Sequence, residues 1–434
     1  MAHIRPFTGI RYARSEAAAF SNLIAPPYDV LDEKQKAALQ AKHPHNIVTI
    51  DLPHMPPKTA GPDEVYQQAS IAMGAWIKAG VMHQDARPAL YPYSQTYQHG
   101  GRAFHRKGVI ALVKLQPFGQ GEVVPHEQTY KGPIEDRLKL MSATGAQLSP
   151  IFGLFSDSRN EVTNLLYHNL SRPEFSGTLD EVQNDLWHIN DADVINQVTD
   201  LMKDKAVYIA DGHHRYTTAL QYQQLAARTN GGTLPPNHPA NYCMFVLVGM
   251  QDAGLLILPT HRLLGGLERF AIAKLQTAFG ANVQMDEASV PAGDTTRLAE
   301  LVAHQPPHTF GLYDGATKKS YTLRLKNLDV LAALEPLQSQ AWRELDVAIL
   351  QRYMIDEVIR PTFCAGKEPA RGYTADAASI VGAVDGVRNQ IALVLQSTPL
   401  HALEVLGKHG EVMPQKSTYF FPKLATGMVI NPLR

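Results

Sequence analysis

Cysteine is almost absent from this sequence of 434 residues, which contains only Cys243 and Cys364. Two cysteines cannot build a disulfide scaffold, so a packed core must stabilise the fold, and both thiols are expected to be buried. No Cys-x-x-Cys pair is present, and His126-Glu127 is not followed by the second histidine of a metalloprotease-type zinc motif. The commonest zinc-binding motifs are therefore excluded.

An excess of charge of either sign is also absent, because 40 lysines and arginines stand against 41 acidic residues. This balance gives no electrostatic case for binding nucleic acid or an anionic membrane. No stretch approaches the roughly 18 apolar residues that span a bilayer, and the N-terminal residues lack the apolar region of a signal peptide. We therefore expect a cytoplasmic protein with a small-molecule partner and no nucleic-acid or membrane partner.

The usual nucleotide-binding and hydrolase motifs are missing as well. Gly366-Lys367 is followed by Glu368 and lacks the upstream glycine of a P-loop. Neither a G-x-G-x-x-G fingerprint nor a G-x-S-x-G nucleophile elbow occurs. These absences exclude the commonest folds for such chemistry, but they do not exclude the chemistry itself.

One short stretch combines regular structure with a dense group of ionisable residues. The apolar run Val207–Ala210 predicts a buried strand, and helical spacing of apolar residues resumes after Gly212. Between them lies a turn that contains Asp211, His213, His214 and Arg215. A strand, tight turn and helix in this order present backbone N–H groups and the positive end of a helix dipole, which suit a phosphate. The alternative is that Asp211 caps the helix and the histidines are polar surface.

Other short polar segments lie at the ends of apolar runs. They are Ala25–Asp29, which includes a Pro-Pro pair, His126–Thr129, His261-Arg262, and Lys416–Thr418. Lysine, arginine and backbone N–H groups neutralise phosphate, and an acid can hold magnesium or accept a hydroxyl proton. Each segment has a simpler interpretation: Asp29 as a helix cap, His126 as a loop residue, Lys416 as a solvated charge. We expect the segments to converge in space.

Two further patterns predict regular structure near these segments. Residues 89–97 and 104–115 flank Gly100-Gly101 and predict a β-hairpin. The apolar run Ile47–Leu52, which Pro53 follows, predicts a strand.

Several of these segments together resemble the uncharacterised bacterial DUF 1015 family. They are Ile4-Arg-Pro-Phe7, Leu23-Ile-Ala-Pro-Pro-Tyr-Asp-Val30, Asn46-Ile-Val48, Val124-Pro-His-Glu-Gln-Thr129, Ser149-Pro-Ile-Phe152, Ala210-Asp-Gly-His-His-Arg-Tyr216, Pro259-Thr-His-Arg-Leu263 and Gln415-Lys-Ser-Thr-Tyr-Phe-Phe-Pro-Lys423. The likeness runs in order from the first residues to the last. The family name by itself implies no activity.

The turn at Asp211 also resembles the nucleotide-binding motif of the ParB/sulfiredoxin superfamily and its free serine kinases. This resemblance implies that Gly212, His213, His214 and Arg215 hold phosphates and that Asp211 supports a metal or the turn. The implied fold is α/β (α+β). It has a ParB/sulfiredoxin-like mixed-sheet nucleotide-binding core with N-terminal elaborations over residues 1–264. The pattern of helical and strand segments predicts a second α+β subdomain over 265–400, and we expect the segment 401–434 to return to the site.

Two members of that superfamily fit this sequence poorly. The turn reads Asp-Gly-His-His-Arg and lacks the sulfiredoxin cysteine, so sulfinic acid reduction is not expected. The basic DNA-binding helices of a partition protein are not evident in a chain of near-neutral charge.

The resemblance to free serine kinases implies a small-molecule kinase that uses ATP or ADP and Mg²⁺, with free L-serine as the leading acceptor. Glu127 is the candidate base, assisted by His126 and Asp211; alternatively, Glu127 is a surface acid paired with Lys131. Lys416, Ser417 and Thr418 are assigned to phosphate, and Tyr28, Asp29, His261 and Arg262 to the acceptor. Two alternatives stay open: a non-catalytic nucleotide-sensing module, and a metal-dependent hydrolase built on His126, His213 and His214.

Overall fold

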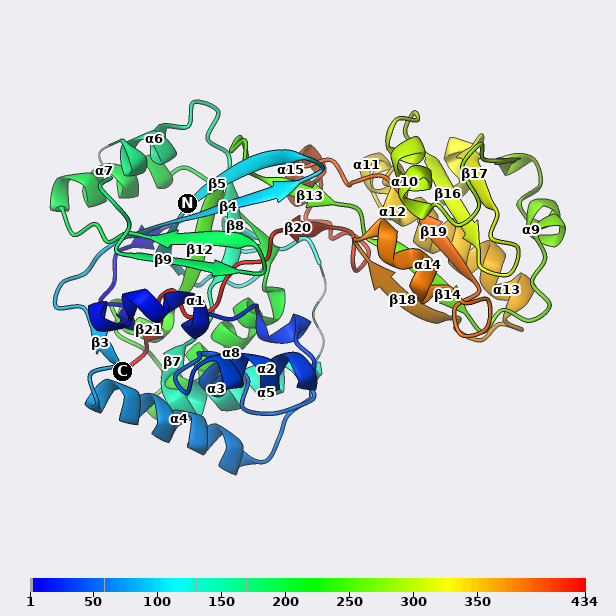
Figure 1. Ribbon diagram of the computed structural model, residues 1–434. Helices are drawn as coiled ribbons and strands as arrows, with labels where there is room; N and C mark the ends of the chain where they lie inside the picture. Colours follow the sequence, from blue (N-terminus) through cyan, green and yellow to red (C-terminus); the bar gives the residue numbers. More distant parts are fainter. Residues whose placement is uncertain (1–2, 58, 128, 130, 169) are drawn as a thin grey trace. The chain divides into compact units, whose positions relative to one another are not determined.

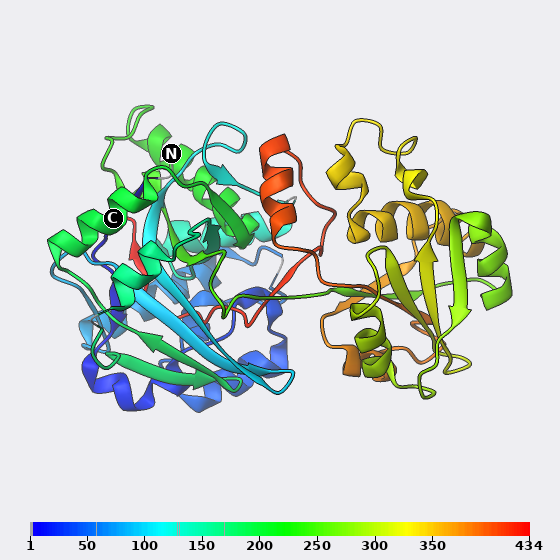
Figure 2. The ribbon, with the colours of Figure 1, turned by 90° about the horizontal axis from the view of Figure 1, so that it is seen from above.

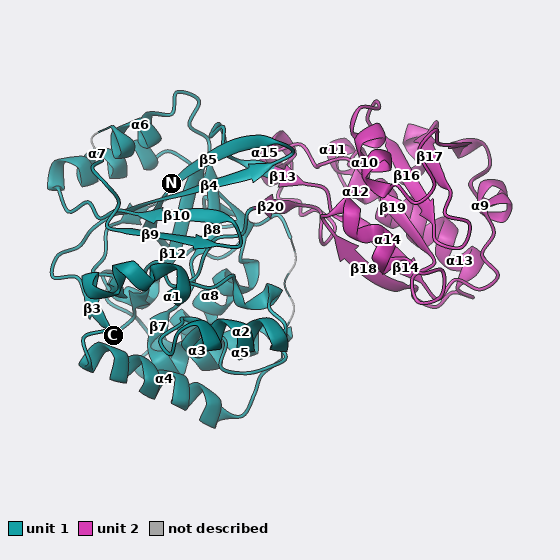
Figure 3. Cartoon of the chain, viewed as in Figure 1, with its two compact units in different colours: residues 1–256, 422–434 teal, residues 257–421 magenta. Residues whose placement is uncertain are grey.

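The computed structural model describes residues 3–434 except 58, 128, 130 and 169. The chain divides into two compact units (Figure 3), of which the first is Met1–Leu256 with Pro422–Arg434 and the second is Ile257–Phe421. The sequence-based boundaries at 264 and 400 differ from this division. His261, Arg262 and Lys416–Thr418 therefore belong to the second unit, and Gln128 of the expected site lies outside the described residues.

The first unit is built on a nine-stranded mixed sheet (Figure 1). In spatial order its strands are β6 (Val123–Val124), β11 (Val207–Asp211), β8 (Ile151–Phe155), β12 (Tyr242–Gly249), β5 (Arg102–Lys114), β4 (Tyr91–His99), β10 (Val182–Leu186) and β9 (Phe175–Leu179), with β1 (Ile4–Arg5) beside β5. Strand β11 is parallel to β6 and antiparallel to β8. The ends of β11 and β6 and the start of β8 therefore lie at one edge of the sheet.

Helices surround this sheet in the first unit. They are η1 (Arg14–Ala19), α1 (Phe20–Leu23), η2 (Tyr28–Val30), α2 (Glu33–Lys42), α3 (Val48–Asp51), α4 (Asp63–Lys78), α5 (Lys131–Thr144), α6 (Glu161–Tyr167), α7 (Ala192–Met202), α8 (His213–Thr229) and η3 (Pro239–Asn241). Side chains of α6, α7 and α8 pack with β5, β11 and β12 in one core cluster, which includes Val198, Tyr216 and Phe245. Removing this apolar surface from water is the main driving force for the arrangement.

The predicted hairpin is confirmed by β4 and β5, the long pair visible in Figures 1 and 2. Gly100 and Gly101 form its turn at φ of 55° and 73°, a backbone region that favours glycine. The hairpin therefore forms where the glycine pair predicts it.

The segment 422–434 completes the first unit after the chain returns from the second. Its strand β21 (Asn431–Pro432) pairs with β7 (Ala146–Gln147), and Ile430 exchanges two backbone hydrogen bonds with Ile10. Thr426 exchanges another pair with Ala25. These bonds tie the returning segment to residues near the start of the chain.

The second unit contains a six-stranded antiparallel sheet of its own. Its strands, in spatial order, are β15 (Val283–Glu287), β17 (Ser320–Leu325), β16 (Thr309–Asp314), β19 (Ile391–Val394), β14 (His261–Gly265) and β18 (Ala370–Thr374). Its helices are α9 (Ile272–Phe279), η4 (Gly280–Asn282), α10 (Thr295–Ala303), η5 (Leu328–Leu331), α11 (Gln340–Arg343), α12 (Asp346–Ala348), the π-helix η6 (Ile349–Ile359), α13 (Arg360–Phe363), η7 (Ala377–Ser379), α14 (Ile380–Ala383) and α15 (His401–His409). Four short strands form two further pairs outside the two large sheets: β2 (Ile10–Tyr12) with β3 (Met82–Gln84), and β13 (Leu256–Leu258) with β20 (Tyr419–Phe421).

Both cysteines are buried, as the sequence analysis predicts, and each is 3% exposed. Burial raises the pKa of the Cys243 thiol to about 12. Among the described residues, no helix combines the length and apolarity that a membrane crossing requires.

The strand predicted over Ile47–Leu52 is wrong, because this segment forms the short helix α3. The cause is Asn46, a fully buried residue whose side-chain oxygen accepts a hydrogen bond from the Val48 N–H at 2.9 Å. Its amide nitrogen donates to the carbonyl oxygens of Asn22 and Ile24 at 2.8 and 3.2 Å. Local side-chain bonding of this kind competes with strand formation.

We predict that Asn46→Ala lowers the free energy of unfolding by about 2–3 kcal/mol, because two carbonyls lose a buried partner. Denaturant unfolding of the full chain measures the change. The matched control is Asn230→Ala, which removes a single exposed hydrogen bond to Ala226 and should cost less than about 1 kcal/mol. Equal losses in the two variants would contradict the role assigned to Asn46.

Candidate functional site

The turn between β11 and α8 has the local structure that its sequence predicts. Strand β11 ends at Asp211, Gly212 follows at a φ of 95°, and α8 begins at His213. The pairing register with β8 shifts between Ile209 and Asp211, just before the turn. The first N–H groups of a helix have no partner within it, so this turn presents donors and positive dipole charge.

The buried side chain of Arg215 stabilises the turn through hydrogen bonds. Its guanidinium donates from Nη1 to the Pro150 carbonyl at the start of β8 and from Nη2 to the Asp211 carboxylate at 3.3 Å. The residue is 9% exposed. A Cβ atom on Gly212 would lie 3.0 Å from the Arg215 Cζ atom, so the glycine lets the guanidinium approach closely. These contacts position the turn; the phosphate-binding role predicted for Arg215 stays a prediction.

Asp211 lies between two cations. Its Oδ2 faces Arg215, and its Oδ1 is 3.5 Å from Nζ of Lys423. Lys423 belongs to the returning segment 422–434 and is one-fifth exposed. The sequence analysis missed this residue, although it ends the quoted motif Gln415–Lys423. Because Ser417 and Thr418 follow Lys416, the sequence analysis assigned the phosphate-binding role to Lys416, the first lysine of that motif.

His126 and His213 join the neighbouring loop to the start of α8. The His126 backbone N–H donates to Nε2 of His213 at 3.2 Å, and Nδ1 of His126 contacts the Ile209 carbonyl oxygen at 2.5 Å. The two rings meet edge to face with centroids 4.6 Å apart. Burial lowers the pKa of His126 and lowers that of His213 well below its usual value, so both imidazoles are neutral at pH 7. The His213 side chain therefore serves as a hydrogen-bond acceptor within the fold.

The Glu127 carboxylate lies at the same sheet edge. Its Oε1 is 3.9 Å from Nε2 of His126, and its side chain is 22% exposed. The carboxylates of Glu127 and Asp211 both raise the pKa of His126 against the effect of burial, so both act on this imidazole. The structure thus brings together the His126-Glu127 and Asp211–Arg215 segments.

Tyr28 and Asp29 lie near Arg215, because Arg215 and Asp29 both act electrostatically on the Tyr28 side chain. The Tyr28 ring is 3% exposed and lies under the Arg137 guanidinium, whose Cζ atom is 3.9 Å from the ring centroid. Arg215 acts electrostatically on Tyr28 and on the buried carboxyl of Asp51. Burial raises the pKa of both groups.

Asp51, Arg137 and Arg215 also line a cavity of about 30 Å³ with Ser149 and Cys243. That volume corresponds to about one water molecule. Asp51 and Arg137 were not identified from sequence, because nothing in the sequence indicates that a short helix and α5 bring them beside Arg215.

The remaining predicted residues lie in the second unit. His261 and Arg262 begin β14 inside its sheet, which corrects their placement at the end of a preceding strand, and both are 1% exposed. Burial lowers the pKa of His261 to about 4.

The Lys416–Thr418 segment begins in a turn. Ser417 donates its hydroxyl to the Pro414 carbonyl, and the Ser417 carbonyl accepts from Thr398 at 2.8 Å. Lys416 is exposed in this turn at a φ of 59°. The substrate and phosphate roles of these residues, with Thr418, stay predictions.

Three solved structures have a partial likeness to this chain. SbnI with a C-terminal truncation from Staphylococcus aureus has 11% identity and a TM-score of 0.35, covering 74% of this chain and 87% of its own. A free serine kinase in complex with AMP has 12% identity and a TM-score of 0.31, covering 69% and 83%. A conserved hypothetical protein from Pyrococcus furiosus has 14% identity and a TM-score of 0.31, covering 70% and 89%.

The sequence comparisons identify the family. No curated protein matches this chain. The sequence model of a family described as "Protein of unknown function (DUF1015)" matches residues 4–348, which is well over half of the chain. This match includes the Tyr28, His126 and Asp211 segments of the candidate site. The chain belongs to the DUF1015 family.

Proposed function

We propose that this protein is a kinase that transfers a phosphate from ATP or ADP to the hydroxyl of a small metabolite, with free L-serine as the leading acceptor and Mg²⁺ as cofactor. The observation that carries the proposal is the β11–α8 turn. It presents the N-terminus of a long helix beside Lys423, Asp211 and Glu127. Phosphoryl transfer needs such positive charge for the phosphates and an acid near the attacking hydroxyl.

Phosphate oxygens would be bound at the turn by the first N–H groups of α8. Lys423 would supply a full positive charge from the returning segment. Arg215 would act indirectly, because its guanidinium already holds Pro150 and Asp211. The turn would thus be preorganised before the nucleotide arrives.

Glu127 would accept the proton of the acceptor hydroxyl as the phosphate is transferred. Its carboxylate is partly exposed, and the His126–His213 contact holds its loop against α8. Mg²⁺ binds one or two carboxylates together with phosphate oxygens and water. Asp211 would supply such a carboxylate, because it lies in the turn that would bind the phosphates.

A nucleotide-sensing module without turnover is the second candidate. One observation favours it: Lys423 lies two residues beyond Phe421, where the chain leaves the second unit, and it pairs with Asp211 in the turn. A phosphate that attracts Lys423 would alter this pair and the segment that carries it. Such a module would bind nucleotide without forming any phosphorylated product.

The hydrolase alternative has less support. Nε2 of His213 and Nδ1 of His126 already contact backbone groups. Within the described part of the chain, His126, His213 and His214 do not form a group of three close ligand atoms.

The function is tested by incubating the purified chain with ATP or ADP, Mg²⁺ and L-serine, alongside a panel of other hydroxyl metabolites. We expect phosphoserine by mass spectrometry. Glu127→Gln should lower kcat by about 100-fold or more while leaving nucleotide affinity unchanged, because it removes only the base. Glu64→Gln, at an exposed acid in α4, is the matched control and should retain full activity. Nucleotide binding without any phosphorylated acceptor would reject the kinase and favour the sensing module.

The two lysines of the motif Gln415–Lys423 can be separated by nucleotide binding. Lys423→Ala should weaken ADP binding by about tenfold, because one charge-assisted contact to phosphate is lost. Lys416→Ala should leave affinity unchanged if Lys423 alone serves the turn. Isothermal titration calorimetry on both variants measures the difference. Loss of affinity only in Lys416→Ala would restore the sequence-based assignment and contradict the present one.

Acidification should weaken the contact between the Glu127 loop and α8. The folded-state pKa of His213 lies below the unfolded value of about 6.5, so its stabilising contribution is complete above that pH and declines as the pH falls. A protonated Nε2 cannot accept the His126 N–H. Hydrogen exchange, corrected for its intrinsic pH dependence, should show the His126 amide protected at pH 7.5 and less protected at pH 5. Equal protection at both values would contradict this link.

A further inference from the structure

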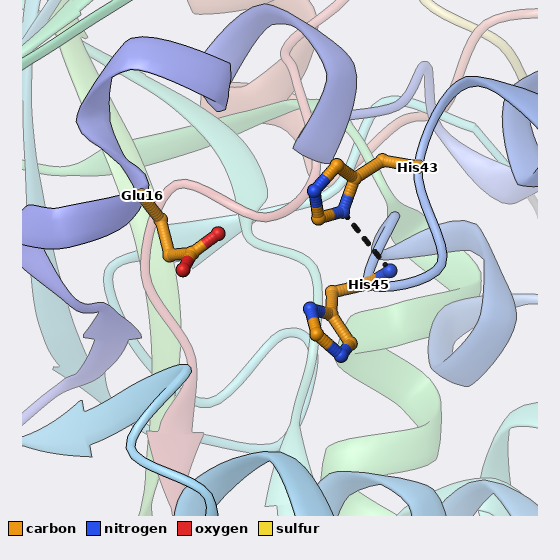
Figure 4. Close-up of side chains that lie close together, drawn as sticks. All are labelled: Glu16, His43 and His45. Carbon is orange, nitrogen blue, oxygen red and sulfur yellow. Dashed lines mark hydrogen bonds between the residues drawn. The ribbon is translucent and has the colours of Figure 1, made fainter.

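A second group of ligand-type side chains lies apart from the turn, in the first unit. Glu16 of η1 faces His43 and His45, which follow the end of α2 (Figure 4). One ligand atom from each residue lies within 4.8 Å of the other two. All three residues are half-buried. The carboxylate and both imidazole rings point into one space between the two segments.

The two histidines are held in place by their surroundings. The Tyr12 hydroxyl donates to the His45 carbonyl at 2.7 Å, and the His45 ring meets the buried Trp76 ring edge to face at 5.4 Å. Nδ1 of His43 accepts the His45 N–H at 3.1 Å. Nδ1 of His45 is buried and has no hydrogen-bond partner among the described residues. A buried polar atom without a partner costs free energy, which a bound ion would relieve.

We propose that Glu16, His43 and His45 form a binding site for a divalent transition metal of the zinc class. Two imidazoles and a carboxylate select such ions over Mg²⁺ or Ca²⁺, which prefer oxygen ligands. Ligands at about 2.1 Å around a tetrahedral ion lie about 3.4 Å apart. Side-chain rotations would have to bring the present ligand atoms, which lie within 4.8 Å of one another, to that spacing. Three protein ligands leave the fourth position for water.

Metal binding has one identifiable cost at His43. An imidazole bound through Nε2 keeps its proton on Nδ1, so it can no longer accept the His45 N–H. A single hydrogen bond between neutral groups contributes much less free energy than a bound zinc ion. The metal contribution is therefore the larger, and the imidazole proton of His43 would move from Nε2 to Nδ1.

The ion would fix η1 against the loop that ends at Asn46. The Asn46 side chain in turn holds the carbonyl oxygens of Asn22 and Ile24, just before the Pro26-Pro27-Tyr28 segment of the candidate site. The site would thus stabilise the N-terminal segment that leads to Tyr28. This inference does not depend on the proposed kinase activity.

The test is equilibrium dialysis of the full chain, stripped with a chelator, against buffered Zn²⁺ and separately Co²⁺. We expect one tightly bound Zn²⁺ per chain, a raised thermal unfolding midpoint, and a Co²⁺ visible spectrum typical of tetrahedral nitrogen and oxygen ligation. His43→Gln and Glu16→Gln should each weaken binding at least tenfold. Glu16 is half-exposed, so its variant is expected to keep the metal-free stability of the wild type, measured by circular dichroism.

His409→Gln, at an exposed histidine ending α15, controls for the loss of one histidine from a chain that has 18. It should bind Zn²⁺ as the wild type does. The proposal is overturned if the wild type binds no stoichiometric Zn²⁺. It is equally overturned if His43→Gln and Glu16→Gln bind as tightly as His409→Gln, because the metal would then be held elsewhere.

Discussion

The buried guanidinium of Arg215 is the interaction on which the rest of the candidate site depends. A charge at this depth is tolerated only when hydrogen bonds and opposite charges surround it. Its partners come from separate parts of the chain: Asp211 from the preceding turn, the Pro150 carbonyl from the start of β8, and the carboxyl of Asp51 from α3. The contacts of this one guanidinium therefore fix the positions of β8, the β11–α8 turn and α3 relative to one another.

The same edge of the sheet combines groups of opposite charge at close range. Lys423 and Arg215 hold Asp211, while Glu127 lies against a neutral imidazole. In the function proposed above, Lys423 would exchange its ion pair with Asp211 for one with a phosphate, with little net change in buried charge. Arg215 and His213 are buried and engaged inside the protein, whereas Glu127 and Lys423 reach solvent.

The parts of the site that the sequence predicts are those fixed by local structure. The strand, glycine turn and helix around Gly212 depend on neighbouring residues, so periodicity and the turn residues suffice to identify them. Lys423 and Asp51 join the site only through tertiary packing, which no sequence spacing encodes. The strand predicted over Ile47–Leu52 failed for a related reason. An apolar segment can form either a buried strand or a buried helix. Here the hydrogen bonds of the Asn46 side chain favour the helix.

The path of the chain adds a consequence for how the first unit is made. Segment 422–434 pairs with residues near Ile10, Ala25 and Gln147, yet it is synthesised only after the whole of the second unit. A nascent chain that has produced the main sheet still lacks Lys423 and the strand that closes on β7. The candidate site is therefore assembled after translation has passed the second unit, so a truncated product would contain the turn without its lysine. The complete candidate site thus forms only in a chain in which the second unit has also been translated.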